Sequence, residues 1–191
     1  MHFIANQLYH IYNKANVNRL LFHSDADYNR FLNSAAAQIK PYCDILSWCL
    51  MPNHFHFLIY ANEQSILEKK VGGNSLQQLT NGFKIMLSSY ANAQNKKEAV
   101  SGNLFQQKTK ANLVDKEHYP LTVFHYLHQN AYKAGLVTKI EQWPYSSFPD
   151  YAGFRNGTLI NKELAIELLG LEMSTFYEDS YRAINFDMSN W

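Results

Sequence analysis

The sequence predicts a single α+β domain in which helices pack against an antiparallel sheet. The chain has 191 residues, of which 47% are hydrophobic and 17% charged, and this composition suits one globular domain with a sizeable core. Strand-like and helix-like segments alternate in the order β-α-β-β-α-β-α. Two of the strand-like segments are joined by a short turn, which is typical of an antiparallel hairpin within a small α+β sandwich.

The first two predicted elements are a strand and a helix. Residues 7–13 alternate and are rich in strand-forming side chains. Asp25 is a suitable N-cap for a helix over residues 25–40, which must end before Pro41. Residues 44–50 and 54–60 are apolar, aromatic-rich runs separated by Met-Pro-Asn, so we predict that they form the hairpin.

Four later elements follow from loop residues, caps and apolar periodicity. They are a helix from Ser75 to about residue 95 after the Gly72–Gly73 loop, a strand over residues 104–114, a helix from Pro120 to Gly135, and a helix near residues 161–170. The third of these elements has an apolar stripe that should pack on the sheet, formed by Leu121, Phe124, Leu127, Ala131 and Ala134.

The cysteine content and the apolar segments limit where the protein can act. Cys43 and Cys49 are too few for a secreted disulfide scaffold and do not form a C-x-x-C pair, so we expect buried thiols in a reducing compartment. The first residues do not resemble a secretory signal, and no apolar stretch is long enough to span a membrane. We therefore expect a cytoplasmic protein with no membrane partner.

Charge is distributed unevenly along the chain, although the formal net charge is only +1. Residues 61–140 contain ten lysines and five acidic residues, whereas residues 141–191 contain three basic and eight acidic residues. A basic middle permits a phosphate-binding surface, and solvated lysines explain the charge equally well. The candidate residues for binding phosphate groups, such as those of a nucleic acid, are Lys84, Lys108, Lys110 and Lys133 in this middle segment.

His54-Phe55-His56 is the sharpest local motif in the sequence. Residues i and i+2 of a strand point to one face, about 7 Å apart, so both imidazoles can reach one ion while Phe55 packs on the other face. Trp48 and Leu50 have the same even parity, and we expect them on the face of the histidines. Two buried histidines that hydrogen-bond to backbone or carboxylate groups would also explain this short pattern.

Tyr126 and Asn130 are the second candidate pair. They are four residues apart on a predicted helix, so their side chains lie one turn apart beside the apolar stripe. Tyr126 can be a nucleophile and Asn130 can supply an amide oxygen to a metal ion. Attack by a phenol with a pKa near ~10 needs help at neutral pH, and a divalent cation can provide it. Histidine, amide and phosphate ligands suit Mg²⁺ or Mn²⁺.

Five blocks of sequence, taken together, resemble one family. They are YHIYN at 9–13, CLMPNHFHFLI at 49–59, LFQQK at 104–108, YLHQN at 126–130 with AGLV at 134–137, and WPYSS at 143–147. In order and spacing they resemble the single-tyrosine HUH transposases, in particular the REP-associated tyrosine transposase branch that is related to the IS200/IS605 insertion elements. The resemblance covers about residues 7–150.

This resemblance implies a ferredoxin-like antiparallel sheet with helices packed mainly on one face. It implies cleavage and rejoining of single-stranded or hairpin DNA through a 5′-phosphotyrosine intermediate, without a nucleotide cofactor. His54 and His56 match the metal-binding pair of the family, Tyr126 matches the nucleophile, and Asn130 matches the third protein ligand. The family includes both monomers and homodimers.

The chain departs from the family pattern at several places. The family often has Asn-Pro-Val after the tyrosine, whereas this chain has Asn130-Ala131-Tyr132, and Gln107 and lysines replace a block rich in glycine and arginine. We predict a transposase domain over residues 1–155 and an acidic, partly helical extension over residues 156–191. The alternatives are an inactive hairpin-DNA-binding protein, another HUH nuclease such as a relaxase or replication initiator, and a metal phosphoesterase that uses water.

Overall fold

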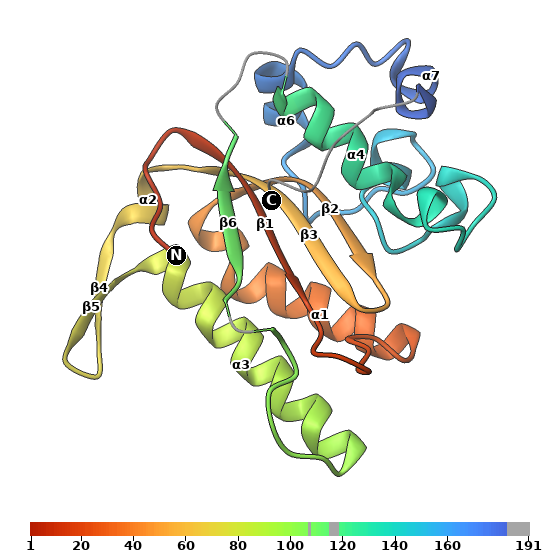
Figure 1. Cartoon of the computed structure of the whole chain (residues 1–191). Helices are drawn as coiled ribbons and strands as arrows, with labels where there is room; N and C mark the ends of the chain where they lie inside the picture. Colours follow the sequence, from red (N-terminus) through yellow and green to blue (C-terminus); the bar gives the residue numbers. More distant parts are fainter. Residues whose placement is uncertain (107, 115–118, 183–191) are drawn as a thin grey trace.

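The computed structural model describes residues 1–106, 108–114 and 119–182 (Figure 1). The strands are β1 (Gln7–Lys14), β2 (Asp44–Met51), β3 (His54–Ala61), β4 (Glu68–Val71), β5 (Asn74–Gln77) and β6 (Lys110–Leu113). The helices are α1 (Asp25–Gln38), α2 (Glu63–Ile66), α3 (Gln78–Glu98), α4 (Tyr119–Lys133), α5 (Phe148–Tyr151), α6 (Lys162–Leu169) and α7 (Phe176–Tyr181), with short 3-10 turns at Lys40–Tyr42 and Ile140–Gln142.

Four strands form one antiparallel sheet in the order β2-β3-β1-β6, and β4 and β5 form a separate hairpin. This order arises because two crossovers interleave their strands: α1 connects β1 to β2, and α3 lies between β3 and β6 along the chain. Each crossover brings its second strand back parallel to the first, with an antiparallel strand between them. The predicted fold class, α+β with a ferredoxin-like antiparallel sheet, is confirmed.

Strand β3 is buried on both faces and separates two hydrophobic cores. Phe55, Phe57 and Ile59 point into the first core, where they meet side chains of α1 and α3 such as Phe31 and Phe83. The alternate residues of β3 point to the second face, on which α4 lies. Successive side chains of a strand alternate between its faces, so one short strand supplies both cores.

The expectation that Trp48 and Leu50 share a face with the histidines is wrong. In the hairpin register Met51 pairs with His54 and Cys49 pairs with His56, so these two odd-numbered residues of β2 lie on the face of the histidines. Only two residues form the turn, and directly opposed residues of an antiparallel pair point to the same face. Trp48 and Leu50 therefore belong to the first core.

Helix α4 lies on the second face of the sheet, mainly across β2 (Figure 1). Its Val123, Phe124 and Leu127 are fully buried and share a core with Leu46 and Leu58. The crossover helices α1 and α3 occupy the first face together, as predicted, but α4 covers the opposite one. A helix with an apolar stripe must bury that stripe, and the first face of the sheet is already occupied.

Two predicted boundaries are wrong. Helix α3 begins at Gln78 rather than at Ser75, because Gly72 and Gly73 form the turn of the β4–β5 hairpin, with φ values of 56° and 84°. The predicted strand over residues 104–114 is reduced to Lys110–Leu113, preceded by an isolated bridge between Phe105 and Ala15. Gln107, within the predicted strand, lies outside the described residues.

After residue 155, helix α7 packs against α4, whereas α6 contacts β2. The ring of Phe176 lies 6.2 Å from that of Phe124 and 5.6 Å from that of Tyr151, measured between ring centroids. The side-chain amide of Gln129 donates a hydrogen bond of 2.8 Å to the carbonyl of Ser180. Residues 183–191 of the predicted acidic extension lie outside the described residues, and the boundary at residue 155 stays a prediction.

Both cysteines are buried and free, which agrees with the expectation from the sequence. Burial raises the pKa of the Cys43 and Cys49 thiols, so both stay protonated at neutral pH. Within the part of the chain that the structure describes, no helix is both long and apolar enough to cross a membrane.

The crossing of α1 and α3 gives a test of the packing. A Cβ atom added at Gly82 would lie 2.0 Å from the backbone oxygen of Gln38, so the two helices would have to move apart. Gly82→Ala should therefore lower the free energy of unfolding by about 1–3 kcal/mol, as overpacking does. Urea unfolding checks this. Ser88→Ala, at an exposed position of the same helix, is the matched control and should have little effect; equal stabilities for the two variants would contradict the close crossing.

Candidate active site

His54 and His56 lie side by side at the beginning of β3. Their ring centroids are 4.9 Å apart and the ring planes are almost perpendicular, at 88°. His54 is half-buried, whereas His56 is only 2% exposed. The turn before them is held from outside the hairpin, because the amide of Ala15 donates to the carbonyl of Asn53 (2.7 Å) and that of Leu21 donates to the carbonyl of Pro52 (2.8 Å). The position of the pair is therefore fixed by neighbouring backbone.

In both histidines the Nδ1 atom has a hydrogen-bonding neighbour. The Nδ1 of His54 lies 2.6 Å from the Oδ1 of Asn53, and an amide oxygen can only accept, so this nitrogen donates. The Nδ1 of His56 lies 2.9 Å from the Nε2 of His10. The Nε2 of His56 is buried and has no hydrogen-bond partner among the described residues. Such an atom is suited to bind an ion.

Burial keeps these imidazoles neutral. It lowers the pKa of His54 to about 4, with a further contribution from the charge of Lys14. Burial also lowers the pKa of His56 well below its ordinary value and that of His10 to about 3. A neutral imidazole has one nitrogen with a free lone pair, which is the form that binds metal ions. The pair is thus available as a ligand set at neutral pH.

A cavity of about 330 Å³ opens in front of the histidines. Its lining residues come from β1, β3, α4 and the segment before β6: Tyr12, Asn13, Lys14, His54, His56, Gln106, Lys108, Lys110 and Tyr126. Three of these residues are lysines and none is acidic. The cavity therefore has the polarity expected of a site for a negatively charged ligand such as a phosphate group.

Tyr126, the candidate nucleophile, is one of the residues that line this cavity. Its ring centroid lies 6.4 Å from that of His56, and the two rings are almost perpendicular. Burial raises the pKa of the phenol, and the neighbouring Cys49 raises it further. Tyr126 is therefore protonated at neutral pH, and it needs assistance to act as a nucleophile.

Asn130 is placed differently from the other predicted site residues. It is 8% exposed, and its amide nitrogen donates to the backbone carbonyls of Tyr126 (3.2 Å) and Leu127 (3.3 Å) in its own helix. It is not among the described residues that line the cavity. The role of Asn130 as a third metal ligand therefore stays a prediction.

The four predicted DNA-binding lysines are all exposed, and they surround the cavity unevenly. Lys108 and Lys110 line it directly. The ammonium group of Lys133 lies 5.6 Å from the centroid of the Tyr126 ring. Lys84 belongs to α3 on the first face of the sheet, and it lines a neighbouring cavity with Lys108 and Lys110. Lys108 and Lys110 thus line both cavities.

Several lining residues were not identified from the sequence. Tyr12 and Lys14 have the same even parity as His10 in β1, so all three point to the second face and toward the histidines of β3. This shared parity in the predicted strand was the sequence signal that could have identified Tyr12 and Lys14 as site residues. Gln106 has no comparable signal, because it belongs to an irregular segment whose position depends on the bridge before β6.

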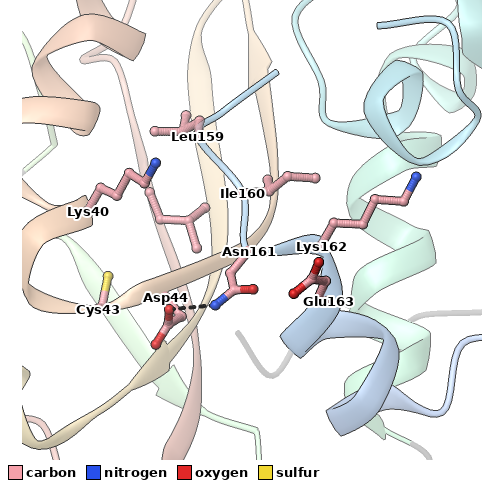
Figure 2. Close-up of a pocket in the computed structure, with 9 residues that line it drawn as sticks. Lys40, Cys43, Asp44, Leu159, Ile160, Asn161, Lys162 and Glu163 are labelled. Atoms are coloured by element: carbon pink, nitrogen blue, oxygen red, sulfur yellow. Dashed lines mark hydrogen bonds between the residues drawn. The ribbon is translucent and has the colours of Figure 1, made fainter. Parts of the chain in front are cut away.

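A second cavity, next to β2, lacks this charge pattern (Figure 2). It is lined by two lysines and two carboxylates, and the carboxylate of Asp44 accepts hydrogen bonds from the side-chain amides of Asn62 (3.0 Å) and Asn161 (2.9 Å). Its polar groups thus satisfy one another. We treat it as a structural feature and use its lysines as controls below.

Among the described residues, no group of three or more His, Cys, Asp or Glu side chains could hold a metal ion. An ion at the His54–His56 pair would therefore complete its coordination with water, an amide or phosphate oxygens. Hard divalent cations such as Mg²⁺ commonly bind in this way.

Comparison with known proteins identifies a similar fold. A REP-associated tyrosine transposase, solved in complex with a REP hairpin, matches 78% of this chain and 80% of its own chain with a TM-score of 0.58 and 16% sequence identity. No protein-family model and no curated protein matches the sequence. At this level of identity the similarity shows a shared fold.

The buried histidines predict a loss of stability in mild acid. Burial lowers the pKa of His125 to about 4 and that of His10 to about 3, whereas histidine in an unfolded chain titrates near ~6.5. Below that value the unfolded chain binds protons that the folded chain does not. Each such histidine therefore reduces the free energy of unfolding by about 1.4 kcal/mol per pH unit until its folded pKa is reached. Urea unfolding at pH 7, 6 and 5 measures the effect.

A variant at another buried histidine provides the control for this pH dependence. The Nε2 of His128 lies 2.8 Å from the hydroxyl of Ser147, and burial lowers the pKa of His128 well below its ordinary value. His128→Gln keeps a polar atom near the serine and removes one titrating group. The free energy of unfolding of this variant should therefore decrease less steeply as the pH is lowered from 7 to 5. Equal stability of the unmodified protein at pH 7 and pH 5 would contradict the assignment.

Proposed function

We propose that this protein is a metal-dependent, transposase-like enzyme that cleaves and rejoins single-stranded DNA, with Tyr126 as nucleophile and His54 and His56 as metal ligands. One observation carries the proposal: Tyr126, the two histidines and two of the predicted lysines line the same cavity. The shared fold with a tyrosine transposase supports it.

The charge of the cavity supports DNA as the substrate. Lys14, Lys108 and Lys110 line it, and none of its described lining residues is acidic, so these residues attract a phosphodiester. The similar structure was solved with a REP hairpin bound. We infer that the partner of this chain is single-stranded or hairpin DNA, bound by a monomer or a homodimer.

The donor atoms of the histidine pair fit a divalent cation. The Nδ1 of His54 donates to Asn53, which leaves its Nε2 as a lone-pair donor, and the Nε2 of His56 has no hydrogen-bond partner among the described residues. Mg²⁺ or Mn²⁺ held there would polarise a phosphate and stabilise the negative charge that develops on it. Asn130 is the predicted third protein ligand.

The proposed step exchanges one phosphoester bond for another. The phenolic oxygen of Tyr126 bonds to phosphorus while the bond from phosphorus to the 3′ oxygen breaks, and the protein keeps the 5′ phosphate. The phenol loses its proton to water and the departing 3′ oxygen gains one. Lys133, beside the phenol ring, stabilises the negative charge that forms as the proton leaves. The tyrosine ester conserves the bond, so rejoining needs no nucleotide cofactor.

The covalent intermediate separates the proposed enzyme from two of the three alternative functions, and the DNA substrate separates it from the third. An inactive hairpin-DNA-binding protein forms no adduct, and a metal phosphoesterase that uses water cleaves DNA without one. Another HUH nuclease, such as a relaxase or replication initiator, also forms a tyrosine adduct but acts on different DNA. The placement of Tyr126 beside the histidines favours the covalent reaction.

Removal of one oxygen atom tests the nucleophile. Tyr126→Phe should abolish the covalent protein–DNA adduct, because phenylalanine has no attacking oxygen. The free energy of unfolding should change by no more than about 1 kcal/mol, since the ring stays in place. The adduct is measured on a denaturing gel after incubation with hairpin DNA and Mg²⁺ or Mn²⁺, and mass spectrometry identifies the linked residue.

Tyr132 provides the matched control for this variant. It lies on the same helix with 44% of its surface exposed, and Tyr132→Phe should leave adduct formation unchanged. An adduct on any residue other than Tyr126 would overturn the mechanism. Cleavage without an adduct would favour hydrolysis by water.

The lysines next to β6 give a second test, based on salt. Each phosphate contact contributes about −0.7 to the slope of log affinity against log salt concentration for single strands. The double substitution Lys108→Ala and Lys110→Ala should therefore weaken DNA binding and reduce the magnitude of that slope by about 0.7 for each contact that is lost. Fluorescence anisotropy with a labelled strand measures both quantities.

Lysines of the cavity next to β2 serve as the control for this experiment. Lys40→Ala and Lys162→Ala remove the same total charge from the second cavity (Figure 2), which shares no described lining residue with the candidate site. They should leave the slope unchanged. Equal effects of the two pairs would show that binding depends on net charge and would exclude a specific surface at β6.

A further inference from the structure

We propose that His10 is a positioning residue for the metal site: its Nε2 accepts the Nδ1 hydrogen of His56 and so holds His56 in the tautomer whose Nε2 can bind a divalent cation. This inference rests on the proposed function of the His54–His56 pair. His10 stands on a different strand, outside the His-x-His motif.

The contact between the two histidines is fixed by the register of the sheet. Strand β1 pairs Tyr12 with His56 and His10 with Leu58, so His10 is the diagonal neighbour of His56 on the same face. The two nitrogen atoms are 2.9 Å apart. His10 is fully buried and His56 is 2% exposed, so water does not compete for this hydrogen bond.

Only one hydrogen atom can occupy the space between the two nitrogens. If His10 donated it, His56 would carry its own hydrogen on Nε2 and could not bind a metal ion. That N–H would belong to a ring that lines a cavity with three lysines, where a lone pair is favoured over a donor. The Nε2 of His56 is buried and has no hydrogen-bond partner among the described residues, so a lone pair on this atom is available to a cation. Donation from His56 to His10 is therefore the favoured arrangement.

The other histidine of the motif is held in the same way. The Nδ1 of His54 donates to the side-chain oxygen of Asn53 at 2.6 Å, so each ring is oriented by a partner at Nδ1. Metal-binding histidines commonly donate their second N–H to such a partner, which fixes the tautomer and the orientation of the ring. His10 serves His56 as Asn53 serves His54.

Tyr12 restricts both rings further. Its ring lies 4.9 Å from that of His10 and 5.8 Å from that of His56, with interplanar angles of 28° and 27°. The rings of His10 and His56 are also close to parallel, at 20°. Neither imidazole can turn over without disturbing this layer, so packing maintains the ring orientations that bring the two nitrogen atoms together.

Two substitutions at His10 separate the hydrogen bond from the packing. His10→Leu fills the space and removes the acceptor, whereas His10→Gln keeps an oxygen that can accept from His56. Calorimetry with Mn²⁺ alone, without DNA, measures affinity for the site. We expect His10→Leu to weaken Mn²⁺ binding about 10- to 100-fold, the usual effect of losing such a partner. His10→Gln should restore most of the affinity.

The control is His128→Leu, which replaces a buried histidine of α4 that contacts Ser147, and it should leave the affinity for Mn²⁺ unchanged.

Nitrogen-15 NMR of the unmodified full chain reports the tautomer directly, even where His10→Leu fails to fold. A hydrogen on Nδ1 of His56 supports the proposal. A hydrogen on its Nε2, or unchanged Mn²⁺ binding by His10→Leu, overturns it. Failure of the unmodified chain to bind Mn²⁺ would instead overturn the proposed metal site itself.

Discussion

The candidate site depends on one constraint, which is that β3 is buried on both faces. Phe55, Phe57 and Ile59 fill the first face, so His56 must occupy the second, where a polar ring needs partners. Its neighbour on β1, His10, supplies a partner for one nitrogen. The other nitrogen has no hydrogen-bond partner among the described residues, and the ring lines a basic cavity. Burial thus creates both the requirement for a ligand and the neutral imidazole that can bind one.

The hairpin turn determines which side chains surround that ring. Because the turn has only two residues, Cys49 is paired with His56. Backbone hydrogen bonds from the amides of Ala15 and Leu21 hold the turn in place. A turn longer by one residue would change this pairing and bring the opposite face of β2 against the histidines. Helix α4 then covers the same face and brings Tyr126 to the edge of the cavity. The site is therefore a consequence of register and of the helix that covers it.

The charge of the site comes from segments that are far apart in the sequence. Lys14 ends β1, Lys108 and Lys110 lie at the beginning of β6, and Lys133 ends α4. Meanwhile the acidic C-terminal part of the chain packs on the outer side of α4, where Gln129 bonds to the backbone of Ser180. None of the described residues that line the cavity is acidic, although the chain as a whole is close to neutral.

The sequence by itself determined the elements and the local pairs. The alternation of β1, the hairpin signal at Pro52, and the spacing of His54 and His56 are all set within a few residues, so they could be predicted. Tyr126 could be predicted as well, through a family resemblance that several separated blocks carry together. Only the tertiary structure decided the rest. His10, Lys14 and Gln106 join the site through strand register and an isolated bridge. Such contacts depend on residues that are distant in the chain, and periodicity within one element carries no information about them.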